Sequence, residues 1–167
     1  MVMRNILILL CLFTGMLTAQ GANSSNKKQM KLEKEKEIRE LIESGNFRFL
    51  ANSANPMSGR SINLTSNYDL KIYNDTIETW LPFFGRAYSV DYGGDGGIKF
   101  KEQAVTIDKK FNSRKKIYEY SIVVKTSQDK YTINLSTGLN GYGNLYVRSQ
   151  NRQPISFYGT IEALDRK

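Results

Sequence analysis

The chain has 167 residues, with 24 lysines and arginines against 16 aspartates and glutamates, which gives a formal charge of +8. It contains no histidine, and Cys11 is its single cysteine. Histidine is the commonest general base and the commonest metal ligand in proteins. Its absence excludes serine–histidine hydrolases and most zinc enzymes.

The first residues have the pattern of a secretory signal peptide. Arg4 supplies a positive charge, residues 6–13 form an apolar run, and Ala19 is a small residue before a polar stretch. This order is typical of a segment that is removed on export. We predict a signal peptide over residues 1–19, cleaved after Ala19, with Gly21 as the alternative cleavage point. The protein is then exported, and is periplasmic or associated with the outer envelope.

Two other interpretations of this segment are less favoured. An uncleaved membrane anchor would need roughly 20 apolar residues, more than the run provides. Lipid attachment at Cys11 would need a small residue just before it, where Leu10 stands. Because Cys11 leaves with the signal peptide, the mature chain has no disulfide, thiolate metal site or cysteine nucleophile. We expect no transmembrane span in the mature protein.

A helix is predicted over residues 31–44, after a flexible polar leader over residues 20–30. Pairs of opposite charge one turn apart support it, namely Glu35 with Arg39 and Lys36 with Glu40. Gly45 is well placed to end the helix in a left-handed conformation. We assign residues 31–167 to a single β-rich domain with this helix at its start.

From Asn46 onward, apolar residues recur with a period of two. About eight strands are predicted, around residues 47–51, 70–73, 76–81, 98–107, 117–125, 130–136, 145–147 and 155–161. Alternation of this kind is typical of antiparallel strands with one buried face. The fold class is therefore mainly β (α+β), an antiparallel meander in a curled sheet or barrel-like form. A β-sandwich is the alternative.

A basic cluster lies between two of these predicted strands: Lys109, Lys110, Arg114, Lys115 and Lys116. Such a patch can meet nucleic acid, anionic lipid or an acidic glycan. We expect instead a solvated turn, and no nucleic-acid partner for an exported protein.

Residues 80–97 break the alternating pattern and are rich in aromatic residues and glycine. A connection this long inside a compact domain is usually functional or mobile. Aromatic walls with a few polar groups are typical of ligand pockets. The candidate ligand-binding residues are Trp80, Phe83, Phe84, Arg86, Tyr88, Asp91 and Tyr92. The alternative for Phe83 and Phe84 is an ordinary core role at the end of the sheet.

Two blocks of sequence resemble a known family. Residues 81–88, Leu-Pro-Phe-Phe-Gly-Arg-Ala-Tyr, form the aromatic block, and residues 151–159, Asn-Arg-Gln-Pro-Ile-Ser-Phe-Tyr-Gly, form the carboxy-terminal block. Together they resemble an exported family from Bacteroidetes, domain of unknown function 4251 (DUF4251). The likeness spans residues 37–164, and Leu-Tyr-Val at residues 145–147 also fits. It implies an exported single domain but no chemistry. Many members look like lipoproteins, from which this chain departs.

The favoured function is a non-catalytic binding module for a small or cell-envelope-derived ligand. One alternative is an envelope scaffold that uses Tyr146, Tyr158, Arg148 and Arg152 as a contact surface. A carboxylate-based hydrolase is less favoured. Its candidates are Asp91, Asp95 and Glu102, and their spacing along the chain does not indicate a catalytic pair. We expect no catalytic residues, no cofactor and no metal. The partner is expected to be a small molecule or an envelope component.

Overall fold

The computed structural model describes residues 21–88 and 96–164. The chain divides into two compact units, residues 1–34 and residues 35–167. The predicted signal peptide lies outside the described residues. Among the residues that are described, no helix combines the length and the apolar character needed to cross a membrane.

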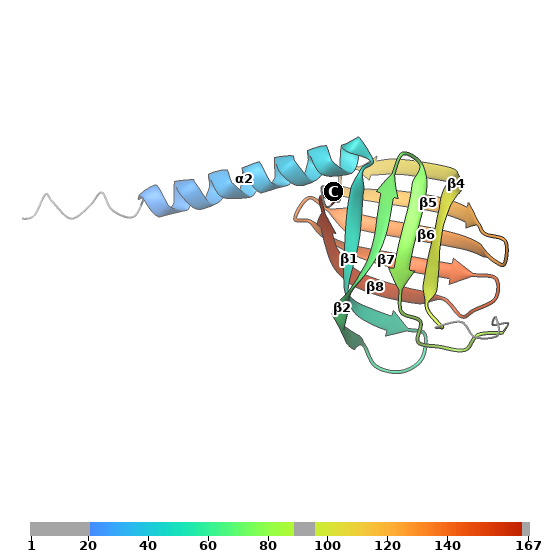
Figure 1. Cartoon of the computed structure of the whole chain (residues 1–167). Coiled ribbons are helices and arrows are strands. Elements are labelled where there is room, and N and C mark those ends of the chain that lie inside the picture. Colours follow the sequence, from blue (N-terminus) through green and yellow to red (C-terminus); the bar gives the residue numbers. More distant parts are fainter. Residues whose placement is uncertain (1–20, 89–95, 165–167) are drawn as a thin grey trace, which may run out of the picture. The chain divides into compact units, whose positions relative to one another are not determined.

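The helix α2 spans Gly21–Ser44 (Figure 1). It begins before Lys31, where the sequence analysis placed its start. The polar residues that we assigned to a flexible leader contain lysine and glutamine, which favour helix, and no proline interrupts them. At the other end Gly45 has a φ of 71° and its N–H donates to the Ile42 carbonyl at 3.2 Å. The predicted left-handed helix end is therefore confirmed.

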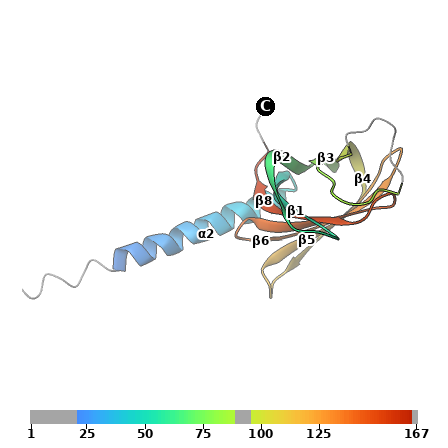
Figure 2. The ribbon, with the colours of Figure 1, turned by 90° about the horizontal axis from the view of Figure 1, so that it is seen from below.

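Eight antiparallel strands follow the helix and close into a barrel (Figures 1 and 2). They are β1 (Phe47–Pro56), β2 (Ile62–Tyr73), β3 (Thr76–Leu81), β4 (Ile98–Asn112), β5 (Ile117–Lys125), β6 (Lys130–Gly138), β7 (Tyr142–Ser149) and β8 (Ile155–Glu162). Each strand pairs with the next, and β8 pairs with β1 to close the ring. The predicted barrel-like meander is confirmed over the β-sandwich.

Side chains of one face of the sheet fill the barrel. Phe47, Phe49 and Phe157 are the largest fully buried ones. Gly159 permits β8 to approach β1, because a Cβ at this position would meet the Leu50 carbonyl oxygen and come within 2.8 Å of the Phe49 ring. The pairing of β8 with β1, which closes the barrel, therefore requires a glycine at position 159.

The turns agree with the sequence pattern. Asn74 and Asp75 join β2 to β3 with φ values of 46° and 61°. Two successive residues with positive φ are the mark of a tight hairpin turn. Arg114, Lys115 and Lys116 of the basic cluster lie in the turn between β4 and β5, Lys109 and Lys110 lie near the end of β4, and all five side chains are exposed. The expected solvated turn is confirmed.

The last turn of α2 belongs to the same core as the barrel. Ile42 is fully buried. The hydroxyl of Tyr120 donates to the Ile42 carbonyl oxygen at 2.6 Å, and the Tyr118 hydroxyl donates to the Glu43 carboxylate. Burial raises the pKa of both tyrosines, and the Glu43 carboxylate adds to the increase. The second unit is thus a barrel with the end of α2 bonded to β5.

Candidate functional site

The aromatic block and the carboxy-terminal block meet at one end of the barrel. Ala87 forms an isolated β-bridge with Arg152. The N–H of Tyr88 donates to the Asn151 carbonyl at 2.7 Å. Two segments separated by the four strands β4–β7 are therefore joined by backbone pairing.

Arg152 joins the two blocks further through its side chain. Its guanidinium lies 5.3 Å from the centre of the Phe83 ring. The Nη1 atom donates to the carbonyl oxygens of Gly96 at 2.7 Å and Gly97 at 2.9 Å. These partners are neutral, and within residues 21–88 and 96–164 no acid forms an ion pair with Arg152.

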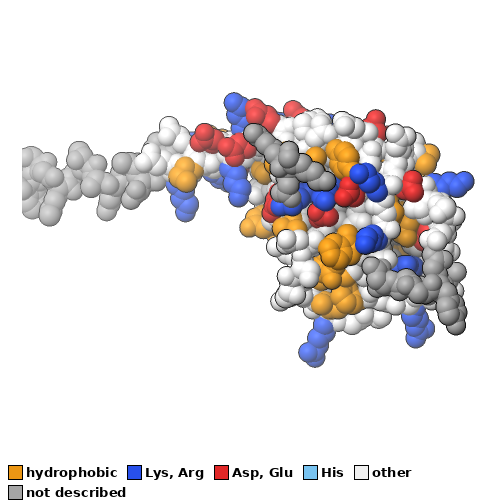
Figure 3. Space-filling view, in the orientation of Figure 1, with side chains coloured by type: hydrophobic (Ala, Val, Ile, Leu, Met, Phe, Trp, Pro, Cys, Tyr) orange, Lys and Arg blue, Asp and Glu red, His pale blue; other side chains and the backbone are white. Residues whose placement is uncertain are grey.

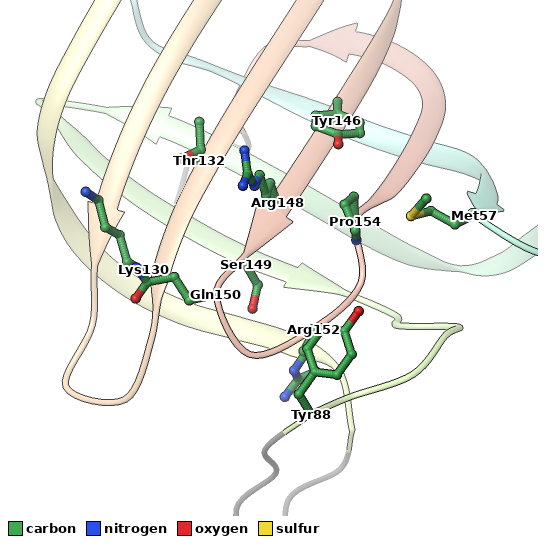
Figure 4. Close-up of a pocket in the computed structure, with 10 residues that line it drawn as sticks. All are labelled: Met57, Tyr88, Lys130, Thr132, Tyr146, Arg148, Ser149, Gln150, Arg152 and Pro154. Atoms are coloured by element: carbon green, nitrogen blue, oxygen red, sulfur yellow. The ribbon is translucent and has the colours of Figure 1, made fainter.

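Beside this junction lies a pocket of about 650 Å³, which we call the cationic pocket (Figure 4). Strands β6 and β7 present Lys130, Thr132, Tyr146 and Arg148 to it, and the two blocks add Tyr88 and Arg152. Thr132 and Arg148 are directly opposite one another in the β6–β7 pairing. The volume is within the usual range of small-molecule sites.

The positive side chains of the cationic pocket form no ion pair with an acid of the described residues. In the described part of the chain, neither the Lys130 nor the Arg148 side chain has an ion pair. The nearby Asp129 carboxylate keeps its negative charge but forms no ion pair with either cation; it accepts hydrogen bonds from the Ser149 hydroxyl at 2.5 Å and from the Gln150 N–H at 3.1 Å. The pocket therefore presents three positive groups to whatever enters it.

Two tyrosine rings complete this pocket. Tyr88 is 70% exposed and Tyr146 is 42% exposed. Over the described residues neither ring packs on another aromatic ring. By contrast, Tyr142 and Tyr158 on the same outer surface are stacked on each other, with ring centres 5.9 Å apart. Tyr88 and Tyr146 therefore keep open ring faces.

A second pocket of about 590 Å³ lies on the outer face of β1–β4, and we call it the mixed-charge groove. Arg48, Asp69, Lys71, Glu78, Trp80 and Lys99 are among its lining residues. Figure 3 shows this face, on which side chains of both charges gather next to hydrophobic ones. It is separate from the cationic pocket, which lies on β6 and β7.

The two carboxylates of the mixed-charge groove differ in their environments. Asp69 is 9% exposed, and burial raises its pKa, while Lys71 and Arg48 partly oppose the increase. The Tyr73 hydroxyl donates to Glu78 at 2.6 Å, and this hydrogen bond holds the pKa of Glu78 below its usual value. Asp69 is thus a nearly buried acid that opens onto a groove.

The ligand-binding candidates predicted from the sequence do not lie together in one pocket. Trp80 lines the mixed-charge groove, whereas Tyr88 lines the cationic pocket. Phe83 is half-buried and packs against the core, in the alternative role that we gave it. Phe84 is 36% exposed, and the backbone of the exposed Arg86 pairs with Gln153.

The remaining candidates fall elsewhere. Asp91, Tyr92 and Asp95 lie outside the described residues, and Glu102 is exposed on β4. No cluster of acidic residues able to hold a metal occurs within residues 21–88 and 96–164.

Sequence reasoning missed Lys130 and Thr132 as pocket residues. It named Tyr146, Arg148 and Arg152 only for a contact surface. The available signal was the outward position of Lys130, Thr132, Tyr146 and Arg148 on neighbouring strands. Their convergence needs the β6–β7 register, which the pattern does not supply.

These features define a small antiparallel β-barrel with open polar pockets on its outer surface. The family model of DUF4251, a domain of unknown function, matches residues 29–161. The chain belongs to this family, and the resemblance noted in the sequence is confirmed.

A solved structure supports the same fold. The crystal structure of a DUF4251 family protein from Bacteroides eggerthii is similar to this chain, with a TM-score of 0.60 and 14% sequence identity. The similarity covers 78% of this chain and 87% of that chain. At this identity it shows the fold alone. None of the curated proteins compared with the chain matches it.

Proposed function

We propose that this domain is a non-catalytic binding module, and that its cationic pocket takes a small anionic ligand from the cell envelope. One observation carries the proposal. Lys130, Arg148 and Arg152 converge on the pocket and form no ion pair with any carboxylate of the described residues, next to the open rings of Tyr88 and Tyr146.

The chemistry of the pocket favours carboxylate or phosphate groups. A guanidinium forms two parallel hydrogen bonds with either group, and charge-assisted bonds are stronger than neutral ones. The open tyrosine faces can cover an apolar or ring-shaped part of the same molecule. An anionic sugar or a phosphorylated small molecule combines these two parts.

The same lining argues for binding without catalysis. None of the described lining residues is a carboxylate, and the chain contains no histidine. General acid–base catalysis usually needs a group whose pKa is near the working pH. Histidine, aspartate and glutamate supply this group most often, and the described lining contains none of them.

A scaffold role for this surface is the second candidate. The stacked pair of Tyr142 and Tyr158 is exposed beside the pocket and offers a flat aromatic area. Tyr146 and Arg148, however, line a concave pocket, which fits a small ligand better than a flat partner.

Native mass spectrometry of the protein isolated from its own cells tests whether a ligand is retained. Calorimetric titration then follows, with inorganic phosphate, pyrophosphate and a galacturonate trisaccharide as anionic probes. We expect Arg148→Ala to weaken binding of the preferred anion about tenfold, which corresponds to roughly 1.4 kcal/mol.

The matched control is Lys110→Ala, which removes the same charge from the exposed β4 end. If Lys110→Ala and Arg148→Ala weakened binding equally, only the net charge would matter and the pocket would be wrong. Tyr146→Ala should also weaken binding of the sugar acid more than that of inorganic phosphate, because phosphate offers no ring face.

We also propose export to the periplasm or the outer envelope, on the signal-like pattern of residues 1–19. Sequencing the amino terminus of the protein from an envelope fraction is expected to give Gln20 as the first residue. An intact Met1 in a cytoplasmic fraction would contradict export.

A further inference from the structure

The mixed-charge groove on β1–β4 is a separate place for recognition, because its residues come from strands that take no part in the cationic pocket. We propose that this groove binds an uncharged, hydroxyl-rich ligand of the oligosaccharide class, with Trp80 as its stacking platform. This inference goes beyond the anion-binding function proposed above and does not depend on it.

Trp80 is an exposed aromatic residue whose ring is held in place by a neighbour. It is the only tryptophan of the chain and is 47% exposed on the outward face of β3. The Tyr68 and Trp80 rings pack in a T-shaped arrangement, with ring centres 5.4 Å apart. A tryptophan that is fixed in orientation and open to solvent offers a large apolar face at little entropic cost.

The charged side chains around Trp80 form ion pairs with one another. Arg48 is paired with Glu162 at 2.8 Å. Lys71 lies 3.4 Å from Glu78 and 3.6 Å from Asp69, and Lys101 lies 3.5 Å from Glu78. Most charges of the groove are therefore paired within the protein.

A paired network of this kind discriminates by hydrogen bonding rather than by net charge. Its carboxylates accept hydrogen bonds from hydroxyl groups, and its ammonium and guanidinium groups donate to them. A charged ligand would have to compete with the existing ion pairs, whereas a sugar can bond to both partners of a pair. Sugar rings also present a C–H face that can lie on an indole.

Lys99 places the ligand relative to the ring. Its ammonium lies over the Trp80 ring, 5.8 Å from the ring centre, and therefore covers part of the face on which a ligand would stack. Lys99 is directly opposite Trp80 in the β3–β4 pairing, and Asp69 is opposite Trp80 on the other side in the β2–β3 pairing. A ligand on Trp80 thus has a donor on one flank and an acceptor on the other.

The experiment uses the fluorescence of the single tryptophan of the full chain. The probes are neutral tetrasaccharides built from glucose, mannose, galactose or N-acetylglucosamine. We expect at least one probe to change the Trp80 emission in a saturable manner. The absence of saturable binding below about 5 mM for all four, by fluorescence and by calorimetry, would overturn the proposal.

Variants assign the binding to the groove, with calorimetry as the readout. Trp80→Ala is expected to weaken binding at least about tenfold, as is typical when a central tryptophan is truncated. Asn67→Ala, at an exposed position of the groove, should weaken it about threefold without affecting folding. Asp69→Asn adds a test of the acceptor, and its circular dichroism spectrum checks that the barrel is intact.

Arg148→Ala separates the two proposed sites. We expect it to leave binding of the neutral tetrasaccharide unchanged, while it weakens binding of the anion in the cationic pocket. Unchanged tetrasaccharide affinity in Trp80→Ala and in Asn67→Ala would show that the sugar binds elsewhere and would refute the groove. That result would leave the anion site untouched, so the two failures are distinguishable.

Discussion

The guanidinium of Arg152 lies 5.3 Å from the centre of the Phe83 ring, and the two residues belong to the two sequence blocks that carry the family resemblance. The same guanidinium donates to the carbonyls of Gly96 and Gly97. One side chain therefore connects both ends of the long β3–β4 connection to the start of β8. It also supplies a charge to the cationic pocket.

Arg152→Ala should destabilise the barrel because it removes both carbonyl hydrogen bonds and the contact with Phe83. We expect a loss of about 2 kcal/mol, which lowers the melting temperature by roughly 4–8 °C for a domain of this size. Thermal denaturation followed by circular dichroism measures it. Arg152→Lys keeps a charged donor but lacks the planar group, so its loss should be smaller. A wild-type melting temperature in both variants would contradict the bridging role.

Gly159→Ala should be among the most damaging small substitutions in the chain. Its Cβ would meet the backbone of Leu50, which cannot move aside without breaking the β1–β8 pairing. We expect a loss of about 3 kcal/mol in the free energy of unfolding, measured with urea. Gly45→Ala is the matched control. There a Cβ meets nothing within 4 Å and only the positive φ is strained, which costs about 1–2 kcal/mol.

Tyr120→Phe tests the bond between β5 and the end of α2. Without the Tyr120 hydroxyl, the Ile42 carbonyl loses its buried donor, and we expect a loss of about 1–2 kcal/mol. Tyr118→Phe should cost less, because its partner Glu43 is exposed and can bond to water. Urea unfolding of both variants checks the order, and the reverse order would contradict it.

The same tyrosine predicts a dependence on alkaline pH. Burial raises the pKa of Tyr120 above the value of 10.0 that it has in an unfolded chain. Folding therefore retains a proton that the unfolded chain releases, and stability falls as the pH rises above 10. We expect Tyr120→Phe to lose less stability than the wild type over this alkaline range.

The fold was largely predictable because burial on one face leaves a period of two in the sequence. On β5, for example, Tyr118, Tyr120, Ile122 and Val124 are all buried, as the alternation requires. Strand length was less predictable on β4, where the bulge between Ala104 and Thr106 shifts the pattern. Closure of the ring depends on the β1–β8 pairing, which joins the two ends of the domain and leaves no local signal.

The candidate pockets were less predictable than the fold. Trp80 and Tyr88 are close in sequence, but Trp80 points outward from β3, whereas Tyr88 pairs with Asn151 next to the β7 end. The sequence analysis grouped the two residues because they are close along the chain, whereas in the barrel they line different pockets. Arg148 and Lys130 converge only through the β6–β7 register, so spacing along the chain could not have revealed them.

Tyr73→Phe should raise the pKa of Glu78, because the Tyr73 hydroxyl is the largest cause of its decrease. A carboxyl with a lowered pKa in the folded state stabilises the protein above its unfolded value of 4.5, and this contribution is lost as the pH falls through the folded pKa. The stability difference between wild type and Tyr73→Phe should therefore be largest near neutral pH and shrink in acid. An NMR titration of the Glu78 carboxyl measures the pKa directly. Lys101→Ala is the control, since its ion pair at 3.5 Å contributes less; a larger shift in Lys101→Ala than in Tyr73→Phe would contradict the assignment.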